Sequence, residues 1–163
     1  MKIGVPKEIK PQENRIGLTP ESVKTLVSEG HEVIVENDGG FEAGFDNDQY
    51  TKAGAKIANN ASDIFNDAEI IVKVKEPQKV EVDMIRENQI VYTYLHLAAA
   101  KELTEGLIKS KSINIAYETV TDDNGRLPLL APMSAVAGRM SVQAGAHCLE
   151  KNQKGRGLLL GGA

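Results

Sequence analysis

Short runs of β-branched and aromatic residues alternate with helix-like segments along most of this chain, and this alternation constrains its fold more than any other feature. The spacing predicts strands at residues 3–5, 31–36, 56–58, 69–75, 89–95 and 113–117. It predicts helices between them at residues 20–29, 47–53, 62–68, 82–87 and 98–110. Strands that alternate with helices form βαβ units, which place parallel strands in one sheet with helices on both faces.

Local signals agree with this pattern. Thr19, Pro20 and Glu21 are typical of a helix start, because a threonine cap, an early proline and an acidic first turn all favour the helix N-terminus. The near-continuous apolar runs at residues 69–75 and 89–95 are typical of strands that are buried on both faces. We therefore expect a doubly wound, mostly parallel α/β sheet, Rossmann-like or flavodoxin-like, over residues 1–128.

The composition changes after Pro128. Residues 133–151 are rich in alanine, glycine, serine and methionine, and they predict one long helix that follows Pro132. A helix placed behind prolines after a completed α/β unit is typical of an interdomain connector. The sequence then ends as GRGLLLGGA without completing a strand or helix, so we interpret residues 129–163 as an interdomain helix and the beginning of a truncated second domain.

Composition and charge exclude several classes of function. The formal net charge is −4, which disfavours a nucleic-acid partner because the phosphates would be repelled. No apolar run approaches the roughly 20 residues that span a bilayer, so no membrane is expected. The N-terminus has no signal-peptide pattern, and a single cysteine fits a reducing compartment. These features predict a soluble cytoplasmic protein.

Four chemically useful side chains follow the predicted strands. In open parallel sheets, ligands bind beyond the carboxyl ends of the strands. This rule selects Arg15 after the first strand, Lys75 and His96 at the ends of two central strands, and Glu118 after the last. We expect a guanidinium, an ammonium, an imidazole and a carboxylate to meet at one edge of the sheet.

Each of these residues has a functional and a structural interpretation. Arg15 can hold a carboxylate through two parallel hydrogen bonds, or it is a solvated loop residue. Lys75 can polarise a carbonyl oxygen, but Lys73 shares its face in simple alternation and competes for that role. His96 is the best general acid/base candidate because imidazole titrates near neutrality, although a lone histidine is more often structural.

Other candidates are weaker. Glu118 either contacts a ligand or caps the following turn, and Tyr94 lies close enough to His96 to line a pocket. Met133 and Ser134 begin the long helix, where exposed N–H groups suit anions, although most helix starts bind nothing. The sequence contains no metal-ligand spacing, no nucleophile elbow and no G-x-G-x-x-G loop.

Several segments together resemble alanine dehydrogenase in order and spacing. They are MKIGVPKEIKPQENRIGLTP, VKVKEP, YLHLAA, IAYETV, LPLLAPMSAVAGR and GRGLLLGGA. In that family the last segment precedes the strand with the dinucleotide fingerprint, so the resemblance implies that residues 129–163 begin a truncated NAD-binding Rossmann domain. It also implies reversible, NAD-dependent conversion of L-alanine to pyruvate and ammonium, in a protein that is usually a homo-hexamer.

The resemblance assigns a role to each matching position. Arg15 and Lys75 become substrate-binding residues, and Lys75 and His96 the catalytic pair, with His96 as proton donor and acceptor. Tyr94, Glu118 and Met133 become pocket-lining substrate contacts, and Ser134 a cofactor contact. The family also uses an aspartate of the nucleotide domain that lies outside this sequence, so we expect this chain alone to be inactive.

Two alternatives remain at this stage. The chain could be a stand-alone module that binds small carboxylates. It could also be a transhydrogenase-like nucleotide-binding subunit, but that group resembles this sequence without the lysine of VKVKEP and the histidine of YLHLAA. Because Lys75 and His96 are both present, the resemblance favours the dehydrogenase.

Overall fold

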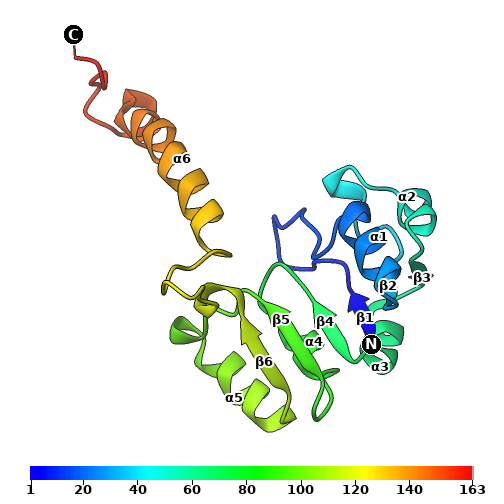
Figure 1. The fold of residues 1–163 in the computed structure, drawn as a ribbon. Coiled ribbons are helices and arrows are strands. Elements are labelled where there is room, and N and C mark those ends of the chain that lie inside the picture. Colours follow the sequence, from blue (N-terminus) through cyan, green and yellow to red (C-terminus); the bar gives the residue numbers. More distant parts are fainter. Residues whose placement is uncertain (163) are drawn as a thin grey trace. The chain divides into compact units, whose positions relative to one another are not determined.

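The computed structural model describes residues 1–162 and contains one six-stranded sheet in which every pair of neighbouring strands is parallel (Figure 1). The spatial order of the strands is β3-β2-β1-β4-β5-β6. Their bounds are β1 Lys2–Val5, β2 Glu32–Glu36, β3 Lys56–Ala58, β4 Ile70–Val72, β5 Ile90–Thr93 and β6 Ile113–Ala116. The predicted doubly wound α/β fold is confirmed, and this strand order is the Rossmann-like one of the two types that the sequence allowed.

Helices connect the strands as the alternation predicts. The α-helices are α1 Pro20–Ser28, α2 Asn47–Lys52, α3 Ala61–Asp67, α4 Lys79–Val82, α5 Lys101–Ser110 and α6 Ala131–Leu149, with short 3-10 turns η1 Phe41–Ala43, η2 Leu97–Ala99, η3 Tyr117–Thr119 and η4 Lys151–Gln153. The Thr19 hydroxyl accepts a hydrogen bond from the Ser22 N–H, and Asp46 forms a capping box with Gln49. Both caps satisfy N–H groups that a helix start otherwise leaves unpaired.

Two hydrophobic cores lie on opposite faces of the sheet. One gathers Val5 and Val33 from the strands with Val23 of α1 and Tyr50 of α2. The other contains Ile34, Ile71 and Val91 of the strands, with Ile64 and Phe65 of α3 and Leu107 of α5. Neighbouring residues of one strand enter different cores because side chains alternate across a β-strand. Because both faces of the sheet are buried, nearly every residue along these strands is apolar.

The order of connections reverses between β1 and β4. From β1 the chain passes outward through β2 and β3, and it then returns to β4 on the other side of β1 before continuing to β5 and β6. In open parallel sheets such a switch point is where ligands bind, beyond the carboxyl ends of the two strands. Arg15 follows β1 and Lys75 follows β4, as the sequence predicts.

Two predicted elements differ from the structure. The strand predicted at residues 69–75 forms only over Ile70–Val72, and β1 pairs with it only at Ile70 and Ile71, because β1 ends at Val5 and Pro6 has no N–H to continue the ladder. The helix predicted at residues 82–87 instead occupies Lys79–Val82. It begins directly after Pro77 because Gln78 and Glu81 form a capping box there.

The chain divides into two compact units, Met1–Thr119 and the residues from Val120 onward. The first contains the complete sheet, and the second contains α6, a helix of 19 residues where the sequence predicts one. The functional boundary at residue 128 remains a prediction. Among residues 1–162, no helix is both long and apolar enough to cross a membrane.

Replacing Gly4 with alanine should destabilise the sheet. A Cβ atom at this position of β1 would lie 2.4 Å from Ile64 Cγ2 and 2.7 Å from Ala68 Cβ, where α3 packs closely on the strand. We expect Gly4→Ala to lower the free energy of unfolding by about 1–3 kcal/mol in urea denaturation. Gly145→Ala is the control, because its Cβ meets nothing within 4 Å and should leave stability unchanged or slightly raised. Equal stability of the Gly4 variant and the wild type would contradict the close packing of α3.

Candidate active site

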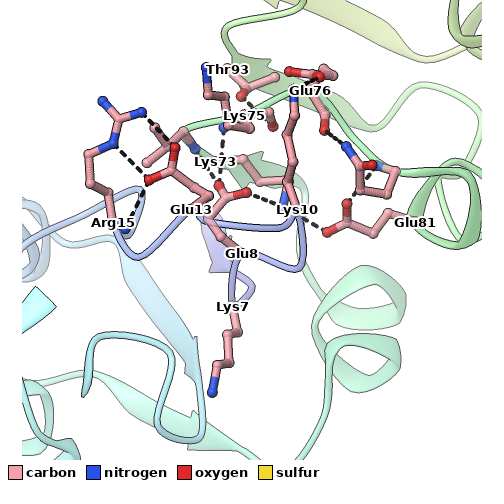
Figure 2. A network of polar contacts seen from close by, with 12 residues as sticks. Lys7, Glu8, Lys10, Glu13, Arg15, Lys73, Lys75, Glu76, Glu81 and Thr93 are labelled. Atoms are coloured by element: carbon pink, nitrogen blue, oxygen red, sulfur yellow. Dashed lines mark hydrogen bonds and ion pairs between the residues drawn. The ribbon is translucent and has the colours of Figure 1, made fainter. Parts of the chain in front are cut away.

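The loop after β1 lies directly on the end of β4. At Gly17 a Cβ atom would lie 2.5 Å from the Val72 carbonyl oxygen and 3.2 Å from the Lys73 nitrogen. Glycine permits this approach of two backbones because it has no side chain. The contact holds the loop segment that carries Glu8, Glu13 and Arg15 against the strand end that carries Lys73 and Lys75 (Figure 2).

Glu8 joins this loop to the end of β4. Its buried carboxylate accepts hydrogen bonds from the Val74 N–H at 2.6 Å and from the Lys75 N–H at 3.2 Å. The Lys73 N–H bonds to Tyr92 of β5, so the next N–H, that of Val74, faces the side of β1, which ends at Val5. A carboxylate forms strong hydrogen bonds to N–H groups, so Glu8 replaces the missing ladder and fixes the backbone of Lys75. The Thr93 hydroxyl donates to the Lys75 carbonyl at 2.9 Å and fixes its other side.

Lys73 is part of a buried ion network. Its ammonium lies 3.1 Å from Glu8 Oε2 and 2.7 Å from Glu81 Oε1, and its side chain is 0% exposed (Figure 2). Burial raises the pKa of Glu81, although the charge of Lys73 and its hydrogen bond oppose this shift. An ammonium enclosed by two carboxylates has no access to a ligand. The structure therefore separates the two competing lysines: Lys73 stabilises the fold, and Lys75 is the one that reaches partial exposure.

Arg15 is held by Glu13. Its Nε donates to Glu13 Oε1 at 2.7 Å and its Nη2 donates to Oε2 at 2.6 Å, so the two side chains form a bidentate pair. The hydrogen bond from Arg15 holds the pKa of Glu13 below its usual range, with a contribution from the charge of Lys75. The Arg15 side chain remains 44% exposed. Glu13 thus orients the guanidinium, and its carboxylate lies within electrostatic reach of both Arg15 and Lys75.

His96 lies just beyond the end of β5, the strand that pairs with β4. It is exposed, and its ring stacks on Tyr94 with centroids 6.1 Å apart and an interplanar angle of 16°. Tyr94 in turn meets Tyr117 edge-on at 5.0 Å. Burial raises the pKa of Tyr117, so this phenol stays neutral at physiological pH. The aromatic side chains support one face of the imidazole.

The Glu118 carboxylate accepts hydrogen bonds from backbone N–H groups. Its Oε1 accepts from the His96 N–H at 2.7 Å and from the Leu95 N–H at 3.1 Å, while Oε2 lies 3.2 Å from the Leu95 nitrogen. The sequence left open whether Glu118 contacts a ligand or caps a turn. In the structure its carboxylate caps the backbone at the end of the neighbouring strand.

Glu76 and Lys10 form an ion pair between the β1 loop and the residues after β4 (Figure 2). Burial raises the pKa of Glu76, but the hydrogen bond from Lys10 and the charges of Lys10 and His96 outweigh burial and lower it. The other Glu76 oxygen is buried and has no hydrogen-bond partner. The Lys10–Glu76 pair thus joins the loop after β1 to the residues after β4.

The structure brings five of the sequence-predicted site residues to one edge of the first unit: Arg15, Lys75, Tyr94, His96 and Glu118. Met133 and Ser134 lie in the first turn of α6, where both are exposed. Sequence reasoning missed the buried roles of Glu8 and Glu81 and the pairing of Glu13 with Arg15. The position of Glu8 shortly after the first strand was an available signal. The rule that ligands bind beyond the carboxyl ends of parallel strands selects Glu8 as well as Arg15.

A family model described as the alanine dehydrogenase/PNT N-terminal domain matches residues 4–137. The chain belongs to this family. The alanine dehydrogenases of Halomonas elongata and Geobacillus stearothermophilus are each 54% identical to it over 162 residues, which is 99% of this chain and 44% of each relative. That of Methanococcus maripaludis is 50% identical over the same length. The chain thus spans less than half the length of these family members.

Solved structures support the same relationship. An L-alanine dehydrogenase superposes with a TM-score of 0.88 and 55% identity, covering 100% of this chain and 45% of that one. A transhydrogenase from Sinorhizobium meliloti superposes with a TM-score of 0.68 and 29% identity over 72% of this chain and 35% of that one. Within the family, the present chain is therefore more similar to the dehydrogenase than to the transhydrogenase.

Removal of the Lys73 ammonium should destabilise the site more than removal of any exposed lysine. We expect Lys73→Met to lower the free energy of unfolding by about 3–5 kcal/mol, because two buried carboxylates lose the charge that they share. Lys56→Met is the matched control, since Lys56 pairs with Glu32 while 70% exposed and should change stability little. Urea denaturation measures the stability of both variants. A loss of stability in Lys73→Met as small as that expected for Lys56→Met would show that the buried network is dispensable.

Proposed function

We propose that this chain forms the amino-acid-binding half of an NAD-dependent L-alanine dehydrogenase. The reaction converts L-alanine, NAD⁺ and water to pyruvate, ammonium, NADH and a proton, and it is reversible. The observation that carries this proposal is that Lys75 and His96 follow the carboxyl ends of the adjacent strands β4 and β5, and that the loop carrying Arg15 lies against the end of β4. The names of the relatives support the choice of alanine as substrate.

The proposed roles follow from the chemistry of each side chain. Arg15 and Lys75 bind the carboxylate of alanine or pyruvate, and Lys75 also polarises the carbonyl oxygen that develops during the reaction. Oxidation of the Cα–N bond gives an imine, to which water adds before ammonium leaves. His96 removes a proton from the added water and returns one to the departing amine, because imidazole exchanges protons near neutral pH. Tyr94, whose ring stacks on His96, is proposed to line the substrate pocket.

The nicotinamide cofactor, when bound, accepts the hydride from the alanine α-carbon. Ser134 is the proposed cofactor contact by analogy with the family, and it is exposed in the first turn of α6. Residues 1–162 contain no G-x-G-x-x-G loop to bind a pyrophosphate. We therefore propose that a Rossmann domain following residues 129–163 in the full-length protein supplies the other nucleotide contacts, and a catalytic aspartate as well.

Assembly and location are further parts of the proposal. By analogy with the family, we propose a homo-hexamer in the cytoplasm. A transhydrogenase-like subunit is less well supported, because the solved transhydrogenase is 29% identical whereas the solved dehydrogenase is 55% identical. A stand-alone carboxylate-binding module would use Arg15 and Lys75 but would give His96 no proton to transfer.

Replacement of His96 should abolish most of the activity of the full-length protein. We expect His96→Ala to lower kcat for alanine oxidation by roughly 10²–10⁴-fold, the usual contribution of a general acid/base. His31→Ala is the control, because His31 precedes β2 at the opposite edge of the sheet and should leave kcat unchanged. The rate of NADH formation measures both variants. Full activity of the His96 variant would remove the residue from the mechanism.

The purified 163-residue chain should form no NADH from alanine and NAD⁺, while the full-length protein does so. The physical reason is that only part of the proposed cofactor site lies in this chain. Circular dichroism of the same sample confirms that the chain is folded when it is assayed. Turnover by the isolated chain would contradict the proposed division of the site between two domains.

A further inference from the structure

The backbone at the end of β5 is held by a side chain from the neighbouring strand. β5 ends at Thr93, and the chain then passes through Tyr94 to His96 before η2 begins. The N–H groups of Leu95 and His96 both point to the Glu118 carboxylate, at 3.1 Å and 2.7 Å from Oε1. Glu118 lies just after β6, the strand that pairs with β5. Its carboxylate therefore accepts N–H groups beyond the point where the pairing of β5 with β6 ends.

His96 needs such support because its backbone is left-handed. Its φ is 50° and its ψ is 39°, a conformation that costs a residue with a Cβ of order 1 kcal/mol or more. The His96 side chain does not cap the turn η2 that follows. The hydrogen bonds to Glu118 therefore compensate for this backbone cost and determine the direction in which the imidazole leaves the chain.

The turn η3 supports the imidazole in a second way. Tyr117, directly before Glu118, packs edge-on against Tyr94 with ring centroids 5.0 Å apart. Tyr94 stacks on His96 at 6.1 Å. Consecutive residues of one turn thus hold both the backbone and, through Tyr94, the ring of His96.

The same arrangement occurs at the neighbouring strand. Glu8 accepts the N–H groups of Val74 and Lys75, just as Glu118 accepts those of Leu95 and His96. In each case the carboxylate bonds the N–H of a proposed reactive residue and that of the residue before it. The repetition at two adjacent strand ends supports a positioning role over a chance contact.

We propose that Glu118 is a positioning residue for His96: its carboxylate holds the His96 backbone in the left-handed conformation that directs the imidazole toward the substrate. The inference rests on the proposed function, in which His96 transfers protons. It differs from a substrate contact, because Glu118 acts through the backbone of Leu95 and His96. Loss of this carboxylate then impairs proton transfer more than substrate binding.

Hydrogen exchange of the full-length protein, read by mass spectrometry, tests the backbone contact without any activity assay. In Glu118→Ala the amides of residues 95–97 should exchange faster than in the wild type, while β1 and β4 keep their rates. Glu118→Gln should fall between them, because its amide oxygen still accepts a hydrogen bond. Glu29→Gln, an exposed glutamate after α1, is the control and should exchange as the wild type does. Unchanged exchange at residues 95–97 in Glu118→Ala would overturn the proposal.

Kinetics of the same variants test the effect on the imidazole. Glu118→Ala should lower kcat roughly 10- to 100-fold, since misplacement of a reacting group by about 1 Å has effects of this size. The KM for alanine should change less than about twofold, and Glu118→Gln should recover much of the lost kcat. A higher KM with unchanged kcat would overturn the proposal in favour of a direct substrate contact. A wild type that does not oxidise alanine would refute the proposed function, while hydrogen exchange would still decide the role of Glu118.

Discussion

The Glu8 carboxylate is the contact on which the arrangement of the site depends. It is buried between the loop after β1 and the end of β4, where it bonds the N–H groups of Val74 and Lys75 and the ammonium of Lys73. A buried carboxylate is costly unless it is paired, and here one ammonium and two amides compensate for its desolvation. The same contact therefore stabilises this edge of the sheet and fixes the backbone of Lys75, which we propose to bind substrate.

Parallel strands create the need for such contacts. β1 ends at Val5 and β6 ends at Ala116, so neither strand continues beside the partly buried N–H groups of Val74 and Leu95. Buried N–H groups must be paired, and Glu8 and Glu118 accept these two at the ends of adjacent strands. The requirement for paired amides thus leads to rigid positions for Lys75 and His96 at the edge where ligands of this fold class bind.

Some parts of this molecule follow from local pattern. The α/β class, the helix cap at Thr19 and most strand positions were predicted because they depend on residues close together in the chain. The strand at residues 69–75 was predicted too long and the helix at 82–87 was displaced. In the first case a neighbouring strand ended early, and in the second a capping box overrode the apolar pattern.

The sequence by itself determined the fold class, the family and the set of polar residues that follow the strands. Strand periodicity, and the rule that ligands bind beyond the carboxyl ends of the strands, need only local information. The tertiary structure decided which of Lys73 and Lys75 is available to a ligand, since burial depends on Glu81 and on a loop that lies 65 residues earlier in the chain. It also decided that Glu118 bonds the backbone of His96, because that contact joins two strand ends that only the folded sheet brings together.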